Sequence, residues 1–562
     1  MAGEGELEAG AGVLEERLRG LLAHNPAWLG PEAAPPWCAD LSLSHEELLE
    51  RTRQWREEGG GVTGPAAPPM RVVQSEELGR HLVAARDIAA GEVLLVEPPL
   101  LLSLRERSPP SCLTCFRRAI TYTCPACGFF LCGPECGAAA HAEECAVLGR
   151  LGLGQPAPRP EEEVRLAALP EEQRAQAREL LQQAAMTAEQ QRRLEVLRQY
   201  RLVPAVTTLL AVRSSPAVAG LVTALQGHVS PSSARYAANQ RRVVEAAVGR
   251  LGVTSDPASV HRVCAVWDTN GFEVPLASGS RVVGLFPAAS LLTHDCRPNT
   301  QQWFTGEGVV VVRVVARVAA GDVVTTSYTD PQWATILRQD HLRLSKQFTC
   351  TCTRCRDPTE LGTFLGSPRC PACGAALLPT DPLDPHAPWS CSGRACTHTA
   401  SAAQVAAVGA KVGTQLKGLT PNDVVGLTAL SRQLQDTLVP THHVLMQLHV
   451  STLKTLFSRD LRELGAEDLA TLSAISSIVK GVLRRLEQPL TRLSVRMGRE
   501  EVRLVLENVR RGVLTGQEAK DRLEELKGVV EECRLVLGWD ARMPPFAPVY
   551  REYQEALQQM SS

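Results

Sequence analysis

The spacing of the cysteines is the feature that most constrains how this chain can fold. Fifteen of its 18 cysteines, taken together with one histidine, make 16 candidate metal ligands, which is enough for four tetrahedral zinc sites. Closely spaced thiolates suit zinc because the ion is borderline-soft and imposes no geometry of its own. The ligands are Cys112, Cys115, Cys124, Cys127, Cys132, Cys136, His141, Cys145, Cys296, Cys350, Cys352, Cys355, Cys370, Cys373, Cys391 and Cys396.

The start of the chain and its apolar pattern indicate a reducing compartment. The first 22 residues are acidic and amphipathic, and they lack the basic start and apolar core of a signal peptide. No run of about 18 apolar residues is present, so we expect no membrane span. We therefore expect a protein of the cytoplasm and nucleus, where cysteines bind metals rather than form disulfides. Cys38, Cys264 and Cys533 stand alone and are expected to be small buried apolar residues.

The charge balance argues against bulk binding to nucleic acid or to a membrane surface. Lys and Arg number 59 against 61 Asp and Glu, which gives a net charge of -2. No cysteine cluster carries a basic recognition helix, so we expect no direct contact with nucleic acid. At 562 residues the chain is too long for one hydrophobic core, and several domains are expected. We expect it to be a monomer.

A candidate β segment follows a long leader. Residues 1–70 are helix-prone, and we identify no chemistry in them. Residues 71–111 alternate and are rich in Val and Leu, which predicts a β-hairpin or meander with a turn at Gly91. Gly79 and Arg80 form another turn in this segment, and an ordinary strand-turn-strand is one interpretation of it.

Residues 112–145 contain three cysteine pairs followed by a histidine and a last cysteine. These 34 residues hold almost no apolar core, so bound metal must supply much of the folding free energy. Their order resembles the MYND finger, in which the first and third pairs share one zinc and the second pair shares another with the last His and Cys. MYND fingers commonly bind short peptides, and Tyr122, Phe129 and Phe130 are candidates for such a surface. An equally good interpretation is that these rings only pack the finger.

Helical spacing returns after the finger. Residues 146–262 carry apolar residues three and four apart with charges between them, which predicts helices. From residue 263, the stretch VCAVWDTNGFEVPL is expected to return to strand, and Asn270 before a glycine there is usually only a turn. The C-terminal part is again helical in its spacing. We expect the adjacent His442 and His443 to lie on different helix faces, in a structural or solvated role.

A second group of motifs follows the predicted strand. A turn rich in His, Cys and Asn begins with Thr293 and His294, and a Val-rich strand after it ends on Tyr328. Phe348 stands just before a tight cluster of three cysteines. This arrangement resembles the closing half of a SET methyltransferase domain, in which the chain threads under itself so that turn and tyrosine meet beside S-adenosylmethionine. Threading of this kind is so rare that the pattern favours this fold.

A SET domain split around a MYND finger is the signature of the SMYD family, which this chain resembles over residues 71–400. The stretches LVAARDI and DPTELGTFLGS and the extra cysteine set look most like the arthropod SmydA branch. The implied fold is α+β, a SET-type β-fold split by a MYND zinc finger and a helical insert and followed by an all-helical TPR-like domain. The implied parts are the leader (1–70), the N-terminal SET part (71–111), the MYND finger (112–145), the helical SET insert (146–262), the core SET (263–335), a post-SET zinc region with an extra four-cysteine zinc site (336–400) and the TPR-like C-terminal domain (401–562).

The resemblance implies transfer of a methyl group from S-adenosylmethionine to the ε-amine of a lysine in a histone or non-histone protein. Tyr328 would be the catalytic residue, orienting the amine at the mouth of the methyl-transfer pore. About four structural zinc ions are implied, and the one that joins Cys296 to the later cluster of three would pin a lid over the donor pocket. The implied donor contacts are Gly79, Arg80, Asn270, Thr293, His294, Tyr328 and Phe348.

Three residues depart from the family pattern. Thr293 stands where the family has Asn, Leu78 where many relatives have Lys, and Lys346 where a ring-stacking Tyr is found. Each loss would cost on the order of 1 kcal/mol or more of donor binding. The alternative is therefore a catalytically weak or inactive SET–MYND adaptor or transcriptional co-regulator. Donor binding separates the two hypotheses, since an adaptor need not retain it.

Overall fold

The computed structural model combines helices and strands. It describes residues 69–118, 122–137, 141–154, 189–228, 230–416, 419–420, 422–486, 492–537 and 547–561. The predicted leader over 1–70 and the predicted helices over 155–188 therefore lie almost wholly outside the described residues.

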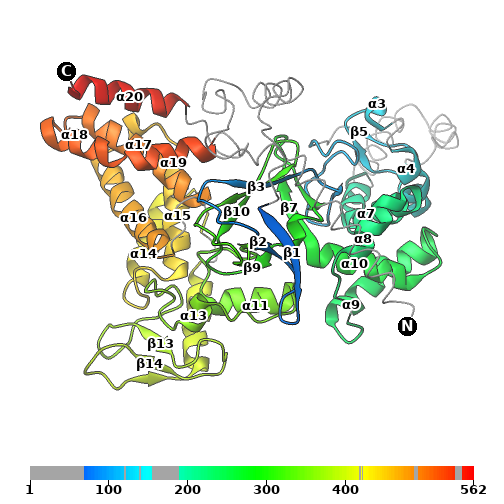
Figure 1. The fold of residues 1–562 in the computed structure, drawn as a ribbon, viewed down its shortest axis with the longest axis horizontal. Coiled ribbons are helices and arrows are strands. Elements are labelled where there is room, and N and C mark those ends of the chain that lie inside the picture. The colour runs from blue at the N-terminus through cyan, green and yellow to red at the C-terminus, as the bar shows by residue number, and fades with distance from the viewer. Residues whose placement is uncertain are drawn as a thin grey trace, which may run out of the picture. The chain divides into compact units, whose positions relative to one another are not determined.

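The described residues form two compact units, and segments of one unit alternate along the sequence with segments of the other. The first unit comprises residues 97–290 and 304–310. The second comprises residues 69–96, 291–303 and 311–561. Figure 1 shows β1, β9 and β10 of the second unit in blue and green, and its helices α14 to α20 in yellow to red.

The second unit opens with a hairpin in the alternating segment, but the hairpin turns before Gly79 and not at Gly91 as predicted, and the strands on either side of Gly91 lie in different sheets. β1 (Met70–Ser75) and β2 (Gly79–Ala84) pair antiparallel, and Ser75 lies opposite Gly79 at the turn. Gly79 has a φ of +63°, a left-handed value that glycine adopts without the steric cost of a Cβ. A separate sheet follows the order β10 (Thr300–Phe304), β11 (Val310–Val314), β3 (Val93–Glu97).

Two short strands bring the histidine motif beside the segment that precedes Tyr328. β9 (Thr293–His294) and β12 (Thr325–Thr326) pair in parallel. The hairpin reaches the same place, because the backbone N–H of Val324 donates to the Leu82 carbonyl oxygen at 2.9 Å. Segments from either side of residues 112–145 therefore lie together in one unit.

The first unit contains an antiparallel sheet, a small finger and several helices. The sheet has the order β4 (Leu101–Ser103), β8 (Arg281–Leu285), β7 (Gly271–Pro275). The finger contains β5 (Tyr122–Thr123), β6 (Phe130–Leu131), α3 (Pro134–Gly137) and α4 (Ala142–Leu148). The helices after it include α7 (Val203–Ser214), α8 (Pro216–Ala224) and α10 (Pro257–Asn270).

The strand predicted from residue 263 begins later than expected, and this prediction was wrong for 263–270. These residues are the second half of α10, and β7 begins only at Gly271. The side chain of Asp256 accepts the N–H groups at the start of α10, and Pro257 occupies its first turn, which are strong helix-start signals. The buried residues along α10 recur three and four positions apart, which suits a helix packed on one face.

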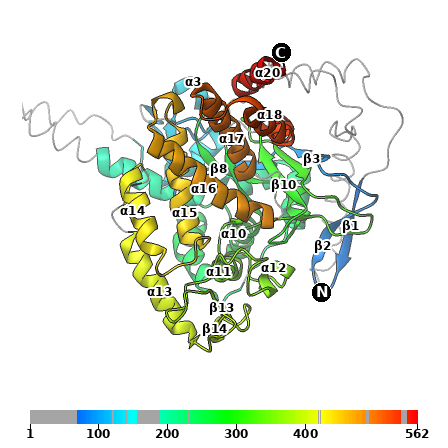
Figure 2. The same cartoon turned by 90° about the vertical axis from the view of Figure 1, so that its left-hand side faces the viewer.

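The C-terminal part is helical, as predicted, and Figure 2 shows several of its helices lying next to one another. At the start of α15 the adjacent histidines are buried or half-buried, so the solvated interpretation was wrong. His442 caps α15 by accepting the Val444 N–H, and His443 contacts the Leu365 carbonyl oxygen at 3.1 Å. The helices are α13 (Ala402–Gln415), α14 (Val424–Leu434), α15 (His443–Phe457), α16 (Ala466–Arg485), α17 (Arg492–Arg510), α18 (Gly516–Glu525), α19 (Lys527–Leu537) and α20 (Ala547–Ser561).

Between Tyr328 and these helices lie two helices and a small three-stranded sheet. The helices are α11 (Thr335–Ser345) and α12 (Thr353–Arg356). The sheet is antiparallel and contains β13 (Leu377–Pro379), β14 (Trp389–Cys391) and β15 (Thr399–Ala400). Within the described residues, no helix has the length and apolar character needed to span a membrane.

Glu97 generates a stability prediction for the first unit. Its buried carboxylate accepts the backbone N–H groups of Ala288 and Ala289 at 3.0 and 2.9 Å. We expect Glu97→Ala to lower the free energy of unfolding by about 2 to 5 kcal/mol, because two buried donors lose their acceptor. Urea unfolding of the zinc-loaded chain followed by circular dichroism measures the change.

The control is Glu77→Ala, which removes an exposed carboxylate at the hairpin turn. Its effect should stay within about 0.5 kcal/mol, as for most surface substitutions. Equal unfolding midpoints for the Glu97 and Glu77 variants would contradict the role given to Glu97.

Candidate functional site

Tyr328 is held by two hydrogen bonds to the segment that carries the histidine motif. Its backbone N–H donates to His294 Nδ1 at 2.9 Å, and its hydroxyl donates to the Leu292 carbonyl oxygen at 2.5 Å. The pairing of Thr326 with His294 brings the two segments side by side. The structure therefore brings the predicted catalytic tyrosine against the predicted donor-binding motif.

Asn299, for which no role was predicted from the sequence, joins the same two segments. Its side-chain amide donates to the Val323 carbonyl oxygen, and its Oδ1 accepts the Thr325 N–H, both at 2.8 Å. Its own backbone N–H donates to Thr325 Oγ1 at 3.0 Å. An Asn side chain can replace a strand partner in this way because it offers both a donor and an acceptor. Its place at the end of the His-Asp-Cys-Arg-Pro-Asn motif was the sequence signal from which a role for Asn299 could have been predicted.

His294 links the tyrosine to the cysteine cluster through its ring. Its Nδ1 accepts the Tyr328 N–H, so the proton of the neutral ring is on Nε2, which lies 3.2 Å from Cys296 Sγ. Burial lowers the pKa of His294 to about 4, so the ring is neutral at physiological pH. The resemblance implied only that His294 contacts the methyl donor. The structure adds a side-chain role, that of orienting Tyr328.

Burial keeps the Tyr328 hydroxyl protonated. It raises the pKa of Tyr328 above its usual value, because a buried phenolate is disfavoured. A protonated hydroxyl is a hydrogen-bond donor, as its bond to the Leu292 carbonyl oxygen requires. The Lys346 ammonium lies 5.4 Å from the centre of the Tyr328 ring. One of the three departures from the family pattern therefore contacts the catalytic candidate as a cation over an aromatic ring.

Thr293 and Phe348 flank the motif in ways that suit ligand contact. The Thr293 hydroxyl oxygen is buried, and no hydrogen-bond partner reaches it within the described part of the chain. A buried polar atom of this kind costs free energy, which a bound ligand would recover. Phe348 is 36% exposed, and its ring centre lies 5.9 Å from that of His294. The Thr293 hydroxyl could therefore form a hydrogen bond with a ligand, and the exposed part of the Phe348 ring could pack against one.

The remaining predicted donor contacts divide between the two units. Gly79 and Arg80 begin β2 in the unit that holds Tyr328, and burial lowers the pKa of Arg80. Asn270 ends α10 in the other unit. Its side-chain amide donates to the carbonyl oxygens of Gln226 and Val266 at 2.6 and 2.9 Å. The structure thus gives Asn270 a local role, and its contact with a methyl donor stays a prediction.

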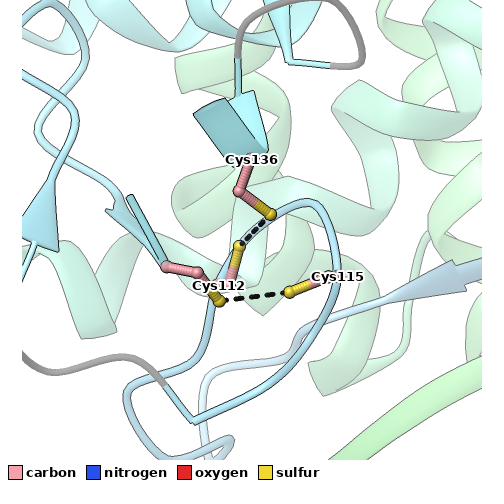
Figure 3. Close-up of side chains that lie close together, drawn as sticks. Cys112, Cys115 and Cys136 are labelled. Carbon is pink, nitrogen blue, oxygen red and sulfur yellow. Dashed lines mark hydrogen bonds between the residues drawn. The ribbon is translucent and has the colours of Figure 1, made fainter. Parts of the chain in front are cut away.

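The predicted ligands of the finger gather in two groups. Figure 3 shows Cys112, Cys115 and Cys136 close together, with dashed lines between sulfur atoms. Cys112 lies 3.6 Å from Cys136, and Cys115 lies 3.2 Å from Cys132, measured between sulfur atoms. The first and third pairs therefore form one group, which is the pairing that the resemblance to a MYND finger implied.

The second group contains the second cysteine pair, the histidine and the last cysteine of the finger. Cys124 Sγ lies 3.6 Å from Cys145 Sγ, and Cys127 Sγ lies 3.2 Å from His141 Nε2. In all four groups of the described residues the ligand atoms lie within 4.8 Å of one another. Because a tetrahedral zinc with Zn–S bonds of about 2.3 Å separates its sulfurs by about 3.8 Å, these donor sets fit zinc.

The aromatic residues of the finger serve mainly to pack it. Phe129 and Phe130 are both 0% exposed, and their ring centres lie 6.1 and 6.4 Å from that of Tyr200. A peptide-binding surface built on these two rings was therefore the wrong alternative. A finger with little interior of its own obtains apolar contacts from the helical segment behind it. Tyr122 is half-buried on β5 and keeps both interpretations open.

A third group joins the histidine motif to the cluster after α11. Cys296 Sγ lies 3.5 Å from Cys355 Sγ and 4.0 Å from Cys350 Sγ, and Cys352 completes the group. Cys296 is two residues from His294, whose ring contacts its sulfur. A zinc ion here would therefore fix the position of the motif that orients the tyrosine.

Two buried arginines and one glutamate surround this third group. Arg338 donates from Nε to Cys296 Sγ at 3.2 Å and from Nη1 to Glu360 Oε2 at 2.7 Å. Arg354 lies 3.4 Å from the same carboxylate oxygen. Both arginine side chains are 0% exposed. Four thiolates around Zn²⁺ carry a formal charge of about -2, so the buried guanidinium groups neutralise a charge that low dielectric makes costly.

These three residues were not predicted from the sequence, although one signal was present. Glu360 belongs to the DPTELG stretch that resembled the SmydA branch. Its backbone has a φ of +52°, and its Oε1 accepts the Thr335 N–H at 3.1 Å. A non-glycine residue at this φ carries a backbone cost, and the Glu360 carboxylate held there contacts Arg338.

The fourth group belongs to the segment 370–400 that carries the sheet β13–β15, which we call the four-cysteine finger. Cys370 Sγ lies 3.8 Å from Cys396 Sγ, and Cys373 Sγ lies 3.3 Å from Cys391 Sγ. From the same finger, Leu383 packs against the third cysteine group.

The solitary cysteines differ among themselves. Cys533 is fully buried, as expected, and Cys264 is only half-buried. Cys38 lies outside the described residues. The expectation of a small buried apolar residue is therefore confirmed for Cys533 alone.

The buried arginine generates a prediction on metal retention. We expect Arg338→Met to speed loss of one of four zinc ions by about 10- to 100-fold, because the thiolates lose a neutralising donor. Zinc release under chelator challenge, followed with a colorimetric zinc indicator, measures the rate. Arg343→Met on the same helix is the matched control, since that side chain is 38% exposed. Release of all zinc at the wild-type rate from the Arg338 variant would refute the neutralising role.

Comparison with known proteins gives long partial matches. Isoform A of the SET domain-containing protein SmydA-8 from Drosophila melanogaster is 28% identical over 58% of this chain and 64% of its own length. Isoform B is 29% identical over 62% of this chain and 71% of its own length. This chain thus matches slightly less than two thirds of isoform A. No family model matches the chain.

Shorter and weaker similarities extend this result. The mouse protein-lysine N-methyltransferase SMYD4 is 34% identical over 24% of this chain and 16% of its own length. A solved SET domain of LSMT, bound to lysine and AdoHcy, aligns with 78% of this chain and 90% of its own at 13% identity, with a TM-score of 0.23, too low to establish a shared fold. The sequence matches carry the conclusion, which is that the chain resembles the SMYD family of SET-domain proteins and, within it, the arthropod SmydA branch.

Proposed function

We propose that this chain is an S-adenosylmethionine-dependent protein-lysine N-methyltransferase. The observation that carries the proposal is the attachment of Tyr328 to the histidine motif through both its backbone N–H and its hydroxyl. Relatives with methyltransferase names support the class of reaction: mouse SMYD4 is named a protein-lysine N-methyltransferase, and Arabidopsis ASHR1 a histone-lysine N-methyltransferase. The substrate would be a protein with a target lysine, in the cytoplasm or nucleus.

The proposed architecture is a SET domain split by a MYND finger and a helical insert. It is supported by the hydrogen bond from Val324 to Leu82, which joins segments that lie before and after the finger in the chain. The helices after residue 401 would form the TPR-like domain of this family. The boundaries set out from the sequence remain proposals, with the helix α10 now ending where β7 of the core SET begins.

The reaction needs alignment more than acid–base catalysis. The donor supplies an activated methyl group, and displacement in line with the lysine amine is fast when both are held in position. The protonated Tyr328 hydroxyl donates to the Leu292 carbonyl oxygen in this structure. With substrate bound, this hydroxyl would orient the lysine amine. A dry apolar channel would keep that amine neutral, because burial lowers the pKa of a lysine.

The residues around the motif would hold the donor. The Thr293 hydroxyl, which makes no hydrogen bond to any described residue, suits the donor's amino-acid part, where the family uses an Asn. Phe348, partly exposed beside His294, suits a flat adenine ring. Zinc would act at a distance in this scheme. Through Cys296 it would fix His294, and through His294 it would fix Tyr328, without taking part in the transfer.

The alternative function is that of an adaptor that does not transfer methyl groups. Two features favour it. Lys346 stands over the Tyr328 ring where relatives have a stacking tyrosine, and Leu78 is 43% exposed at the hairpin turn where many have a lysine. An adaptor would work through its finger and its helical domain, and it would not need the donor.

Thr293→Val separates the two functions. Valine keeps the shape of threonine but lacks the hydroxyl, and that hydroxyl makes no hydrogen bond within the described residues. For an enzyme, we expect micromolar binding of S-adenosylmethionine that weakens about 10-fold in the variant, the value of one hydrogen bond. Calorimetric titration of the zinc-loaded chain measures the affinity, and the melting temperature should not fall.

Tyr328→Phe is the companion variant. The variant should bind the donor about as well as the wild type, because the hydroxyl that it lacks would contact the lysine amine rather than the donor's amino-acid part. No measurable donor binding by a folded wild-type chain that retains its zinc would favour the adaptor.

A further inference from the structure

A cavity of about 930 Å³ lies in the second unit, and the methyl-transfer site does not account for it. Its walls are α11, the loop from Pro379 to Trp389 of the four-cysteine finger, α13 and one side of α15. Figure 2 shows α11, α13 and the strands β13 and β14 together in one region of this unit. The volume is at the upper end of the range for small-ligand pockets, about 300 to 1,000 Å³, and it would hold a few residues of a peptide.

Two helices present apolar side chains to the cavity. On α13 these are Val405, Val408 and Val412, spaced so that they share one helix face. On α11, Ile336 and Leu337 line the cavity and are 48% and 37% exposed. Apolar surface left in contact with solvent favours a ligand that covers it.

The charged side chains of the cavity are mainly acidic. The lining contains one arginine, Arg343, and one lysine, Lys454. Arg343 forms an ion pair with Asp340 at 2.6 Å. The buried Glu360 is already held by Arg338. The four aspartates in the lining are Asp330, Asp357, Asp381 and Asp384. They make the cavity suited to a cation and unsuited to a phosphate or a nucleic acid.

Two tryptophans in the lining add a second preference for cations. Trp333 precedes α11, and Trp389 begins β14 of the four-cysteine finger, so each belongs to a different wall. An indole ring attracts an ammonium or guanidinium group over its face. The lining therefore suits a Lys or Arg side chain with apolar neighbours. The carboxylates and indole rings would contact the cation, and the apolar side chains of α11 and α13 would contact its neighbours.

We propose that this cavity binds a basic segment of a partner protein in which lysine or arginine alternates with apolar residues. The acidic loop of the four-cysteine finger is the wall that selects for charge, and α13 is the wall that selects for apolar character. This gives the fourth cysteine group a purpose, because its metal would hold the Asp381–Asp384 loop in place. Binding of this kind requires neither the methyl donor nor methyl transfer.

Fluorescence anisotropy with a defined peptide pair tests the proposal on the full zinc-loaded chain. One peptide is a fluorescein-labelled nonamer that alternates leucine and lysine, and its counterpart replaces every lysine with glutamate. We expect the lysine peptide to bind at least about 10-fold more tightly than the glutamate peptide, because the lining is acidic. Comparable binding of the two peptides, or no binding of the lysine peptide, would overturn the proposal.

A pair of charge-neutral substitutions locates the site. Asp381→Asn with Asp384→Asn removes two charges but keeps the turns, because Oδ1 of asparagine can still accept the N–H groups of Leu383 and His386, each at 2.9 Å in the native chain. We expect affinity for the lysine peptide to fall at least about 10-fold, since two attractive charges are lost. Asp521→Asn on α18, outside the cavity, is the control and should bind like the wild type.

The apolar wall is tested separately with Ile336→Ser. Because this side chain is 48% exposed, the variant should fold and retain its zinc, while its affinity for the lysine peptide falls several-fold. Wild-type affinity in both the aspartate double variant and the Ile336 variant would show that the peptide binds elsewhere and would refute the assignment of the cavity.

Discussion

The contact between the buried Arg338 guanidinium and the Cys296 sulfur is the interaction on which the candidate site depends. Arg338 also binds Glu360, and Glu360 in turn caps the backbone of Thr335 at the start of α11. One buried charge thereby holds together Cys296 of the histidine motif, the helix α11 and the loop at Glu360, which lies more than 60 residues after Cys296. Such a network is costly to break, because removal of one member leaves an unpaired charge in a low-dielectric interior.

The consequence for function runs from the metal group to the tyrosine. Cys296 contacts the His294 ring, the His294 ring accepts the Tyr328 N–H, and the Tyr328 hydroxyl reaches the Leu292 carbonyl oxygen. Each contact is a hydrogen bond between buried or half-buried groups, so little freedom remains for the tyrosine. A zinc site that takes no part in chemistry would therefore still decide whether the catalytic candidate stands in its working position.

Sequence alone predicted what depends on local spacing. The cysteine groups and the first hairpin were predictable because metal-ligand spacing and strand alternation are properties of short segments. The apolar run over 263–270 suits a strand or a helix equally, and the cap formed by Asp256 with Pro257 decided for a helix. Burial of Arg338 could not be predicted, because an arginine is usually exposed and its partners lie far along the chain.

Methyl transfer to a lysine is tested most directly by mass spectrometry. The zinc-loaded chain is incubated with cell extract and S-adenosylmethionine that carries a deuterated methyl group. The wild-type chain is predicted to place heavy methyl groups on lysine side chains of at least one protein, and Tyr328→Phe, which keeps the ring but lacks the hydroxyl, is predicted to place none. Absence of heavy methyl-lysine with a wild-type chain that binds the donor, or equal labelling by the Tyr328→Phe variant, would contradict the role assigned to this tyrosine.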